Sequence, residues 1–171
     1  DLVATVCTPR SPKCDACPWQ ELCAAHRCGK EEALPIHEKK QPPRVVHVTV
    51  CLMMNGNRVW VEQRKEALLK GLSVFLLIEG EHPLTPEEVT AALTEKGFSD
   101  AKLISELGHA KHVFTHRVWE MDIRQYATRQ TPAESGRFVG MGELKSLPFP
   151  TAMRAALTAA LKLLQSSDKS D

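Results

Sequence analysis

Four cysteines near the amino end are the residues of this 171-residue chain whose spacing most clearly indicates chemistry. They follow the pattern C-x6-C-x2-C-x5-C and are Cys7, Cys14, Cys17 and Cys23. No histidine stands among them. Four thiolates gathered by one short loop are the ligands of a cubane iron-sulfur cluster or of a tetrahedral zinc ion. The segment therefore predicts a metal centre.

Three interpretations of this cysteine pattern differ in what they require. Disulfides are typical of small secreted scaffolds, whereas this chain continues into long apolar patterns that can build a core of their own. Structural zinc usually takes two C-x2-C pairs, and here only Cys14 and Cys17 form one. A [4Fe-4S] cluster is the interpretation we favour, and metal and sulfide analysis would separate the three. Cys28 and Cys51 lie outside the pattern and are expected to be ordinary thiols.

The cysteine loop is basic and rich in proline. Arg10 and Lys13 project from its longest segment between ligands, and Pro9, Pro12 and Pro18 stiffen it. A basic loop held by a rigid metal centre can clamp a phosphate backbone. The simpler alternative is that the two cations only keep the loop soluble and offset the negative charge of a thiolate-bound cluster.

The overall composition does not by itself indicate a nucleic-acid partner. Lys and Arg number 22 and Asp and Glu number 21, which leaves a formal charge of +1. Affinity for DNA must therefore come from local basic patches. No apolar run reaches the roughly 18 residues that a membrane-spanning helix needs, so the sequence predicts no membrane partner.

A proline-rich basic stretch marks the predicted domain boundary. Residues 35–44 contain Pro35, Pro42 and Pro43 beside two lysines and an arginine, which favours an extended connector over a packed element. Before it, residues 24–34 are expected to form a short polar helix. The predicted organisation is a metal loop at residues 1–28, a linker at 29–44, a folded domain at 45–165 and a disordered tail at 166–171.

The folded domain opens with a strand pattern. Residues 45–54 are β-branched and apolar, Asn55-Gly56-Asn57 is a turn sequence, and residues 58–64 alternate in period two, which together predict a β-hairpin. A third apolar run, residues 72–79, is bounded by glycines and predicts a buried strand. Trp60 and Trp119 fall within strand patterns and are expected in the core.

A helix is predicted at residues 86–96. Thr85 suits its N-cap, Glu87 and Glu88 suit the positive end of the helix dipole, and Gly97 suits its end. Further strands are predicted at residues 102–107, 111–124 and 137–140, and a terminal helix with apolar residues at helical spacing is predicted at 151–164.

Three segments of the chain together resemble a known family. Residues 1–18 resemble the cluster loop that ends the catalytic domain of helix-hairpin-helix DNA glycosylases. The proline-rich basic linker and residues 110–119, with the sequence AKHVFTHRVW, resemble the C-terminal half of the adenine DNA glycosylases that excise adenine mispaired with 8-oxoguanine. The resemblance extends over nearly the whole chain.

This resemblance implies an α+β fold, with a Nudix-like mixed sheet and flanking helices preceded by a [4Fe-4S] cluster loop and an extended linker. It implies base-excision repair of double-stranded DNA with A:8-oxoguanine or A:G mispairs, by a monomer at the nucleoid in the bacterial cytoplasm. The family's catalytic glutamate and aspartate come from helices that precede the cluster loop, and no residue here matches them. We therefore expect this chain to bind DNA and recognise 8-oxoguanine without excising adenine by itself.

The resemblance assigns recognition to Phe114, Thr115 and His116, which match the family's F-[ST]-H loop. 8-Oxoguanine carries a hydrogen on N7 where guanine has a lone pair, so its reader must accept a hydrogen bond there. A threonine hydroxyl can accept that bond, a histidine can add a polar contact or stack, and Phe114 would pack inward or wedge near the base stack. Without the resemblance, the alternation of the segment favours an ordinary edge strand.

A hydrolytic function is the alternative. Nudix hydrolases carry a long motif whose glutamates bind divalent metal. The predicted helix supplies Glu87, Glu88 and Glu95 but lacks the arginine and the closing glutamate pair of that motif, so these carboxylates are expected to be a solvated face. A Nudix-type nucleotide pyrophosphohydrolase with a fused metal-binding loop is the second function class, and a stand-alone redox or zinc-binding protein is a weaker third.

The chain departs from the family in the third strand, which usually carries W-E-F-P. Residues 71–77, GLSVFLL, keep only Phe75 of that motif, and Val3 stands where a glycine is expected. The loss of the tryptophan and proline puts the usual packing of the strand in question. Elsewhere, Trp19 is expected to shield the cluster from solvent. His109 and His112 flank Lys111 and are either a small titratable patch facing phosphate or ordinary surface residues, and the sequence does not choose between the two.

Overall fold

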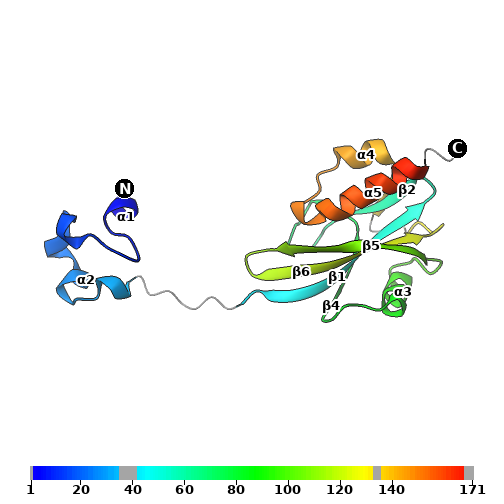
Figure 1. Cartoon of the computed structure of the whole chain (residues 1–171). Helices are drawn as coiled ribbons and strands as arrows, with labels where there is room; N and C mark the ends of the chain where they lie inside the picture. The colour runs from blue at the N-terminus through cyan, green and yellow to red at the C-terminus, as the bar shows by residue number, and fades with distance from the viewer. Residues whose placement is uncertain (1, 35–41, 133–135, 168–171) are drawn as a thin grey trace. The chain divides into compact units, whose positions relative to one another are not determined.

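The structure is a computed structural model that describes residues 2–34, 42–132 and 136–167. The chain forms two compact units, Asp1–Pro42 and Pro43–Asp171, whose elements are labelled in Figure 1. Most of the predicted connector, residues 35–41, lies outside the described residues, as do residues 168–171 of the predicted tail.

The amino-terminal unit is a succession of short helical turns. They are α1 Leu2–Thr5, η1 Cys14–Ala16, η2 Gln20–Leu22, α2 Ala24–Arg27 and η3 Glu31–Ala33. The single helix predicted at residues 24–34 is therefore wrong, because Gly29 adopts a φ of 61° and separates α2 from η3. No side chain that the structure describes between residues 2 and 34 is fully buried. Apolar packing alone does not hold this part of the chain together.

The strands of the second unit form one mixed sheet. Their order across the sheet is β3-β2-β1-β6-β5, with β4 paired to β1 and β7 paired to β2. β1 and β6 run parallel, and the other paired strands are antiparallel. The strands are β1 Arg44–Asn55, β2 Arg58–Gln63, β3 Ser73–Val74, β4 Leu76–Gly80, β5 Lys102–Val113, β6 Arg117–Ala127 and β7 Gly136–Val139.

Helices cover both faces of this sheet. Figure 1 shows α4 and α5 on one face and α3 on the other. The helices are α3 Pro86–Glu95, α4 Met141–Ser146, η4 Thr151–Met153 and α5 Arg154–Ser167, and α5 thus extends into the predicted tail. No helix within the described ranges is long and apolar enough to cross a membrane.

The core is divided between the two faces because side chains alternate along a strand. Val50 and Leu52 of β1 belong to the hydrophobic cluster that α5 covers, whereas Cys51 of the same strand belongs to the cluster that α3 covers. Trp60 and Trp119 are fully buried, as predicted.

The predicted β-hairpin is confirmed. β1 and β2 pair antiparallel, with Asn55 opposite Arg58, so that Gly56 and Asn57 form the loop. Gly56 has a φ of 55°, which a residue without a Cβ adopts readily at the first position of a tight hairpin loop.

The predicted third strand is broken in two. β3 pairs with β2 and β4 pairs with β1, and Phe75 lies between them. Phe75 is fully buried, and its ring centroid lies 5.0 Å from that of Phe149. The segment is therefore packed even though it lacks the tryptophan and proline that the family usually carries there.

The strands predicted at residues 102–107 and 111–124 are corrected by the structure. β5 continues to Val113 and β6 begins only at Arg117, so the predicted second strand contains a turn at residues 114–116. Gly108, just past the predicted end of the first strand, has a φ of 133° and lies at a register shift. A β-bulge absorbs the glycine and lets the strand continue.

The predicted start and end of α3 are confirmed. The Thr85 hydroxyl accepts a hydrogen bond from the Glu88 backbone N–H at 3.3 Å, and the Glu88 carboxylate accepts one from the Thr85 backbone N–H at 2.8 Å. This reciprocal pair is a capping box. Gly97 follows the helix with a φ of 90° and ends it.

Replacing Thr85 by alanine is expected to lower the free energy of unfolding by about 1 kcal/mol, because the Glu88 backbone N–H loses its acceptor. Thr94→Ala, at an exposed position of the same helix, is the matched control and is expected to change stability little. Chemical denaturation followed by circular dichroism measures both variants. Equal stability of the two would contradict the role of the cap.

Asp100 ties the turn after α3 to the segment after β6. Its carboxylate accepts hydrogen bonds from the Thr128 hydroxyl and from the Arg129 backbone N–H, the latter at 2.8 Å. These bonds, that of Thr128 first, hold the pKa of Asp100 below its ordinary value of 3.8.

The stability that Asp100 contributes should therefore depend on pH. Because folding lowers the pKa of Asp100, its contribution is fully present above pH 3.8 and is lost as the pH falls through the lowered value. The stability difference between the natural chain and Asp100→Asn is expected to be constant near neutral pH and to shrink in strong acid. Urea denaturation at a series of pH values measures it. A difference that widens in acid would refute this assignment.

Candidate functional site

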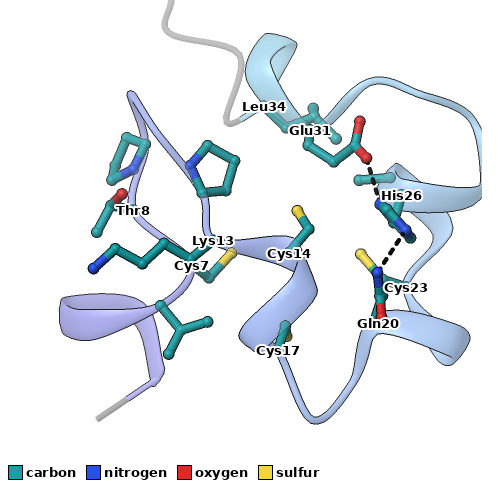
Figure 2. A pocket seen from close by; sticks show the side chains of 14 residues that line it. Cys7, Thr8, Lys13, Cys14, Cys17, Gln20, Cys23, His26, Glu31 and Leu34 are labelled. Carbon is teal, nitrogen blue, oxygen red and sulfur yellow. Dashed lines mark hydrogen bonds and ion pairs between the residues drawn. The ribbon is translucent and has the colours of Figure 1, made fainter.

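The four predicted cysteines line one cavity of the amino-terminal unit (Figure 2). The cavity has a volume of about 380 Å³. Apolar residues supply much of the rest of its wall: Val6, Pro9, Pro12, Ala25 and Leu34. The structure thus gathers all four thiols around one largely apolar space.

Backbone hydrogen bonds of tight turns position these thiols. The Cys17 N–H donates to the Cys14 carbonyl at 2.9 Å, which closes the C-x2-C turn. The Lys13 N–H donates to the Val6 carbonyl at 2.8 Å, which closes the longest gap between two of the cysteines. Backbone hydrogen bonds thus close both the C-x2-C segment and the x6 segment of the cysteine pattern.

The described cysteines do not form a compact tetrahedral zinc site. In tetrahedral zinc with Zn–S bonds of about 2.3 Å, neighbouring sulfurs are about 3.8 Å apart. Among the described residues, the ligand atoms gathered within 4.8 Å of one another belong to Cys14, His26 and Glu31, not to three of the cysteines. The four thiols line one cavity, and cysteine thiolates are the ligands that an iron-sulfur cluster takes.

The electrostatics of Cys14 also favour a positively charged occupant. Burial raises the pKa of the Cys14 thiol, and the negative charges of Glu31 and of the other three cysteines raise it further. Several thiolates in one cavity are therefore unfavourable without compensating charge. Bound iron supplies that charge and holds the thiols in their ionised form.

The two remaining cysteines do not line this cavity. Cys28 is exposed and is absent from the cavity wall. Cys51 is buried in the core of the second unit, and burial raises its pKa to about 12, so its thiol is inert. The expectation that Trp19 shields the cluster is wrong, because its side chain is 61% exposed and does not line the cavity.

The two basic residues of the cysteine loop are both exposed. Lys13 also lines the cavity, whereas Arg10 lies outside its wall. Their exposure leaves both cations available to a phosphate backbone.

Besides Thr8, three polar residues that the sequence pattern did not indicate also line the cavity: Gln20, His26 and Glu31. His26 Nδ1 lies 2.5 Å from Glu31 Oε1, and His26 Nε2 lies 3.1 Å from Gln20 Nε2 (Figure 2). A hydrogen bond from its own backbone and then one from His26 hold the pKa of Glu31 below its ordinary value. No periodic pattern marks these residues, and their only sequence signal is that they closely accompany the last cysteine.

The second feature of interest is the turn between β5 and β6, residues 114–116. The Phe114 N–H donates to the Arg117 carbonyl at 2.8 Å, and the Arg44 N–H donates to the His116 carbonyl at 3.1 Å. Thr115 and His116 are exposed, whereas Phe114 is half-buried. The edge-strand interpretation of this segment is therefore wrong, and the structure presents two polar side chains at a closed turn.

Edge-to-face contacts between aromatic rings support this turn. The Phe114 ring lies 5.1 Å from that of Trp119 and 4.6 Å from that of His112, edge-to-face in both cases. Beyond them, the Arg64 guanidinium lies 5.2 Å from the centre of the Trp119 ring and donates to Glu79 at 2.7 Å. Phe114 was expected either to pack inward or to wedge near the base stack, and in the structure its ring packs inward against Trp119.

A patch of His109 and His112 is not formed as one unit. His109 Nδ1 lies 2.5 Å from an Asp122 carboxylate oxygen, whereas His112 contacts the Phe114 ring. The two histidines are three residues apart on β5 and therefore lie on opposite faces of the strand.

The carboxylates of α3 are not arranged as a metal site. Glu88 is held in the capping box, and Glu87 and Glu95 are exposed. The expectation that these residues form a solvated face agrees with this arrangement.

Two family models match the chain. A NUDIX domain matches residues 49–159, and the iron-sulfur binding domain of endonuclease III matches residues 7–23. The first match covers most of the second unit, and the second coincides with the four cysteines.

Curated relatives match most of the chain. The adenine DNA glycosylase of Rattus norvegicus is 29% identical over 188 residues, covering 79% of this chain and 36% of the rat protein. That of Mus musculus is 27% identical over 183 residues, with 79% of this chain and 35% of the mouse protein covered. This chain thus spans little more than a third of the length of these relatives.

Solved structures share the fold of the second unit. The solution structure of the E. coli ORF135 protein aligns with a TM-score of 0.55 and 14% identity, over 75% of this chain and 96% of that one. MutT of methicillin-resistant Staphylococcus aureus 252, a Nudix hydrolase, aligns with a TM-score of 0.53 and 14% identity, over 71% and 98% of the two chains. At such identities the likeness establishes the fold alone, and it confirms the predicted Nudix-like sheet with flanking helices.

The cysteine loop, the sheet and the relatives lead to one assignment. The amino-terminal loop is an iron-sulfur binding domain of the endonuclease III type, as the sequence predicts. The chain belongs to the NUDIX domain family and is related to the adenine DNA glycosylases.

Proposed function

We propose that this chain is the DNA-binding and lesion-reading part of an adenine DNA glycosylase, acting on duplex DNA in which adenine is mispaired with 8-oxoguanine or guanine. The observation that carries the proposal is the turn at residues 114–116, which presents two polar side chains from a rigid aromatic support. Curated relatives that match 79% of the chain are named adenine DNA glycosylases, which supports it.

In this proposal Cys7, Cys14, Cys17 and Cys23 hold a [4Fe-4S] cluster. The iron of the cluster would offset part of the negative charge of the four thiolates, and the cluster would provide a rigid centre around which the loop folds. The exposed side chains of Arg10 and Lys13 then contact the DNA phosphates, and the cluster holds their loop in one conformation. Such contacts position a protein on DNA without reading its sequence.

Recognition of the damaged base falls to Thr115 and His116. The Thr115 hydroxyl accepts the hydrogen bond from N7–H of 8-oxoguanine, which guanine cannot donate. The His116 ring supplies a second polar contact from the same turn. Phe114 supports both from below through its contact with Trp119.

The chain's own contribution is binding and reading, and none of its residues is proposed to break the glycosidic bond. The hydrolase alternative finds no support in α3, where one glutamate serves the helix cap and the other two are exposed. Pyrophosphate cleavage would require carboxylates that converge on a divalent metal.

Replacing both Thr115 and His116 by alanine is expected to reduce the preference of the chain for 8-oxoguanine over guanine opposite adenine. One net hydrogen bond is worth about 0.5–1.5 kcal/mol, so the ratio of the two dissociation constants should fall by about 2–10-fold. Fluorescence anisotropy with two duplexes that differ only at the lesion measures this ratio. Thr94→Ala, a substitution on α3 outside the turn at residues 114–116, is the control. An unchanged ratio of dissociation constants in the double variant would contradict the proposed role of Thr115 and His116 in lesion recognition.

Replacing Cys17 by serine is expected to abolish the cluster, because a thiolate ligand is lost from its centre. Anaerobically purified protein should then lose its brown colour, its iron and its acid-labile sulfide, and its DNA affinity should fall. Cys28→Ser is the matched control and should keep all four properties. Stoichiometric zinc without iron in the anaerobic natural chain would overturn the cluster assignment.

A further inference from the structure

One group of metal-binding side chains in the amino-terminal unit is not explained by the four-cysteine centre. Ligand atoms of Cys14, His26 and Glu31 lie within 4.8 Å of one another. All three residues are half-buried and line the same cavity (Figure 2). Only Cys14 belongs to the cluster loop pattern, so the imidazole and the carboxylate need a separate account.

The fold holds the histidine and the glutamate in place. His26 belongs to α2 and Glu31 to η3, and the Gly29 N–H donates to the His26 carbonyl at 3.1 Å where the chain turns between them. Gln20 contacts the far side of the imidazole at 3.1 Å and fixes its orientation. The contacting atom is the amide nitrogen of Gln20, which donates, so zinc binding requires the amide to turn by about 180°. Its oxygen then accepts from His26 Nε2–H and leaves the Nδ1 lone pair to the metal, as the outer partners of metal-bound histidines do.

The chemistry of the three groups selects a class of metal. Thiolate, imidazole and carboxylate are the three ligand types that zinc takes, commonly three at a time with water in the fourth position. Magnesium and calcium prefer sites made of oxygen alone. We propose that Cys14, His26 and Glu31 form a binding site for a zinc-class divalent cation, which is filled only when the iron-sulfur cluster is absent.

Mutual exclusion follows from the shared ligand. Cys14 Sγ cannot serve an iron of the cluster and a separate zinc ion at once, and both would occupy the same cavity. Within the described ranges, no three cysteine sulfurs lie within 4.8 Å of one another, as the ligand atoms of Cys14, His26 and Glu31 do. The cysteines alone therefore form a less compact set of zinc ligands. A chain that has lost its cluster is therefore expected to hold zinc through this mixed set.

Zinc titration of the full chain tests the proposal. Cluster-free and cluster-loaded protein are each titrated with Zn²⁺ against a chromophoric chelator. The cluster-free chain should bind one equivalent, and the cluster-loaded chain should bind none at this site. Loss even of an outer partner of a metal ligand weakens binding about 10–100-fold, so His26→Gln and Glu31→Gln should each weaken zinc binding at least about tenfold. Equal zinc binding by the two forms would overturn the exclusion.

A matched control and a direct measurement complete the test. Glu32→Gln, the exposed neighbour of Glu31, should leave zinc affinity unchanged, and all three variants should still load iron and sulfide in full. X-ray absorption of the zinc-bound natural chain needs no variant and should report a mixed shell of sulfur with nitrogen or oxygen. A shell of four sulfurs, or zinc affinity indifferent to both His26→Gln and Glu31→Gln, would refute the site while leaving the proposed repair function untouched.

Discussion

The parallel pairing of β1 with β6 is the interaction on which the rest of the second unit depends. The strands are in register from Arg44 opposite Arg117 to Met54 opposite Ala127. Alternate side chains of both strands enter the two hydrophobic clusters, and a slip of one residue would exchange the faces that they present. The same register fixes where β6 begins, and the backbone bond from Arg44 to His116 ties the exposed turn to that point.

The amino-terminal unit follows a different physical rule. Its described side chains are at best half-buried, so hydrophobic burial contributes little there. Its short turns instead converge on a cavity whose wall contains four thiols, an imidazole and a carboxylate. A unit of this kind is stabilised chiefly by metal–ligand bonds, because the free energy of metal binding becomes free energy of folding.

The features that were predicted from sequence have local causes. The hairpin follows from β-branched strands around Gly56, and α3 follows from Thr85 and Gly97 at its ends. The break between β5 and β6 could not be predicted, since residues 114–116 contain no glycine, proline or asparagine. The bulge at Gly108 also lets β5 continue past its predicted end. The convergence of Gln20, His26 and Glu31 was equally hidden, because it depends on how three separate turns meet rather than on any repeat along the chain.

The support beneath the turn at residues 114–116 links segments that are distant in sequence. Arg64 leaves β2, is anchored by Glu79 of β4 and the Leu68 carbonyl, and lies against Trp119 of β6, which in turn carries Phe114. These positions cannot drift independently during evolution. A substitution of the arginine would leave an unfilled space over the indole. Its effect would also reach the segment before β3, because the Arg64 backbone exchanges hydrogen bonds with Gly71 and Leu72.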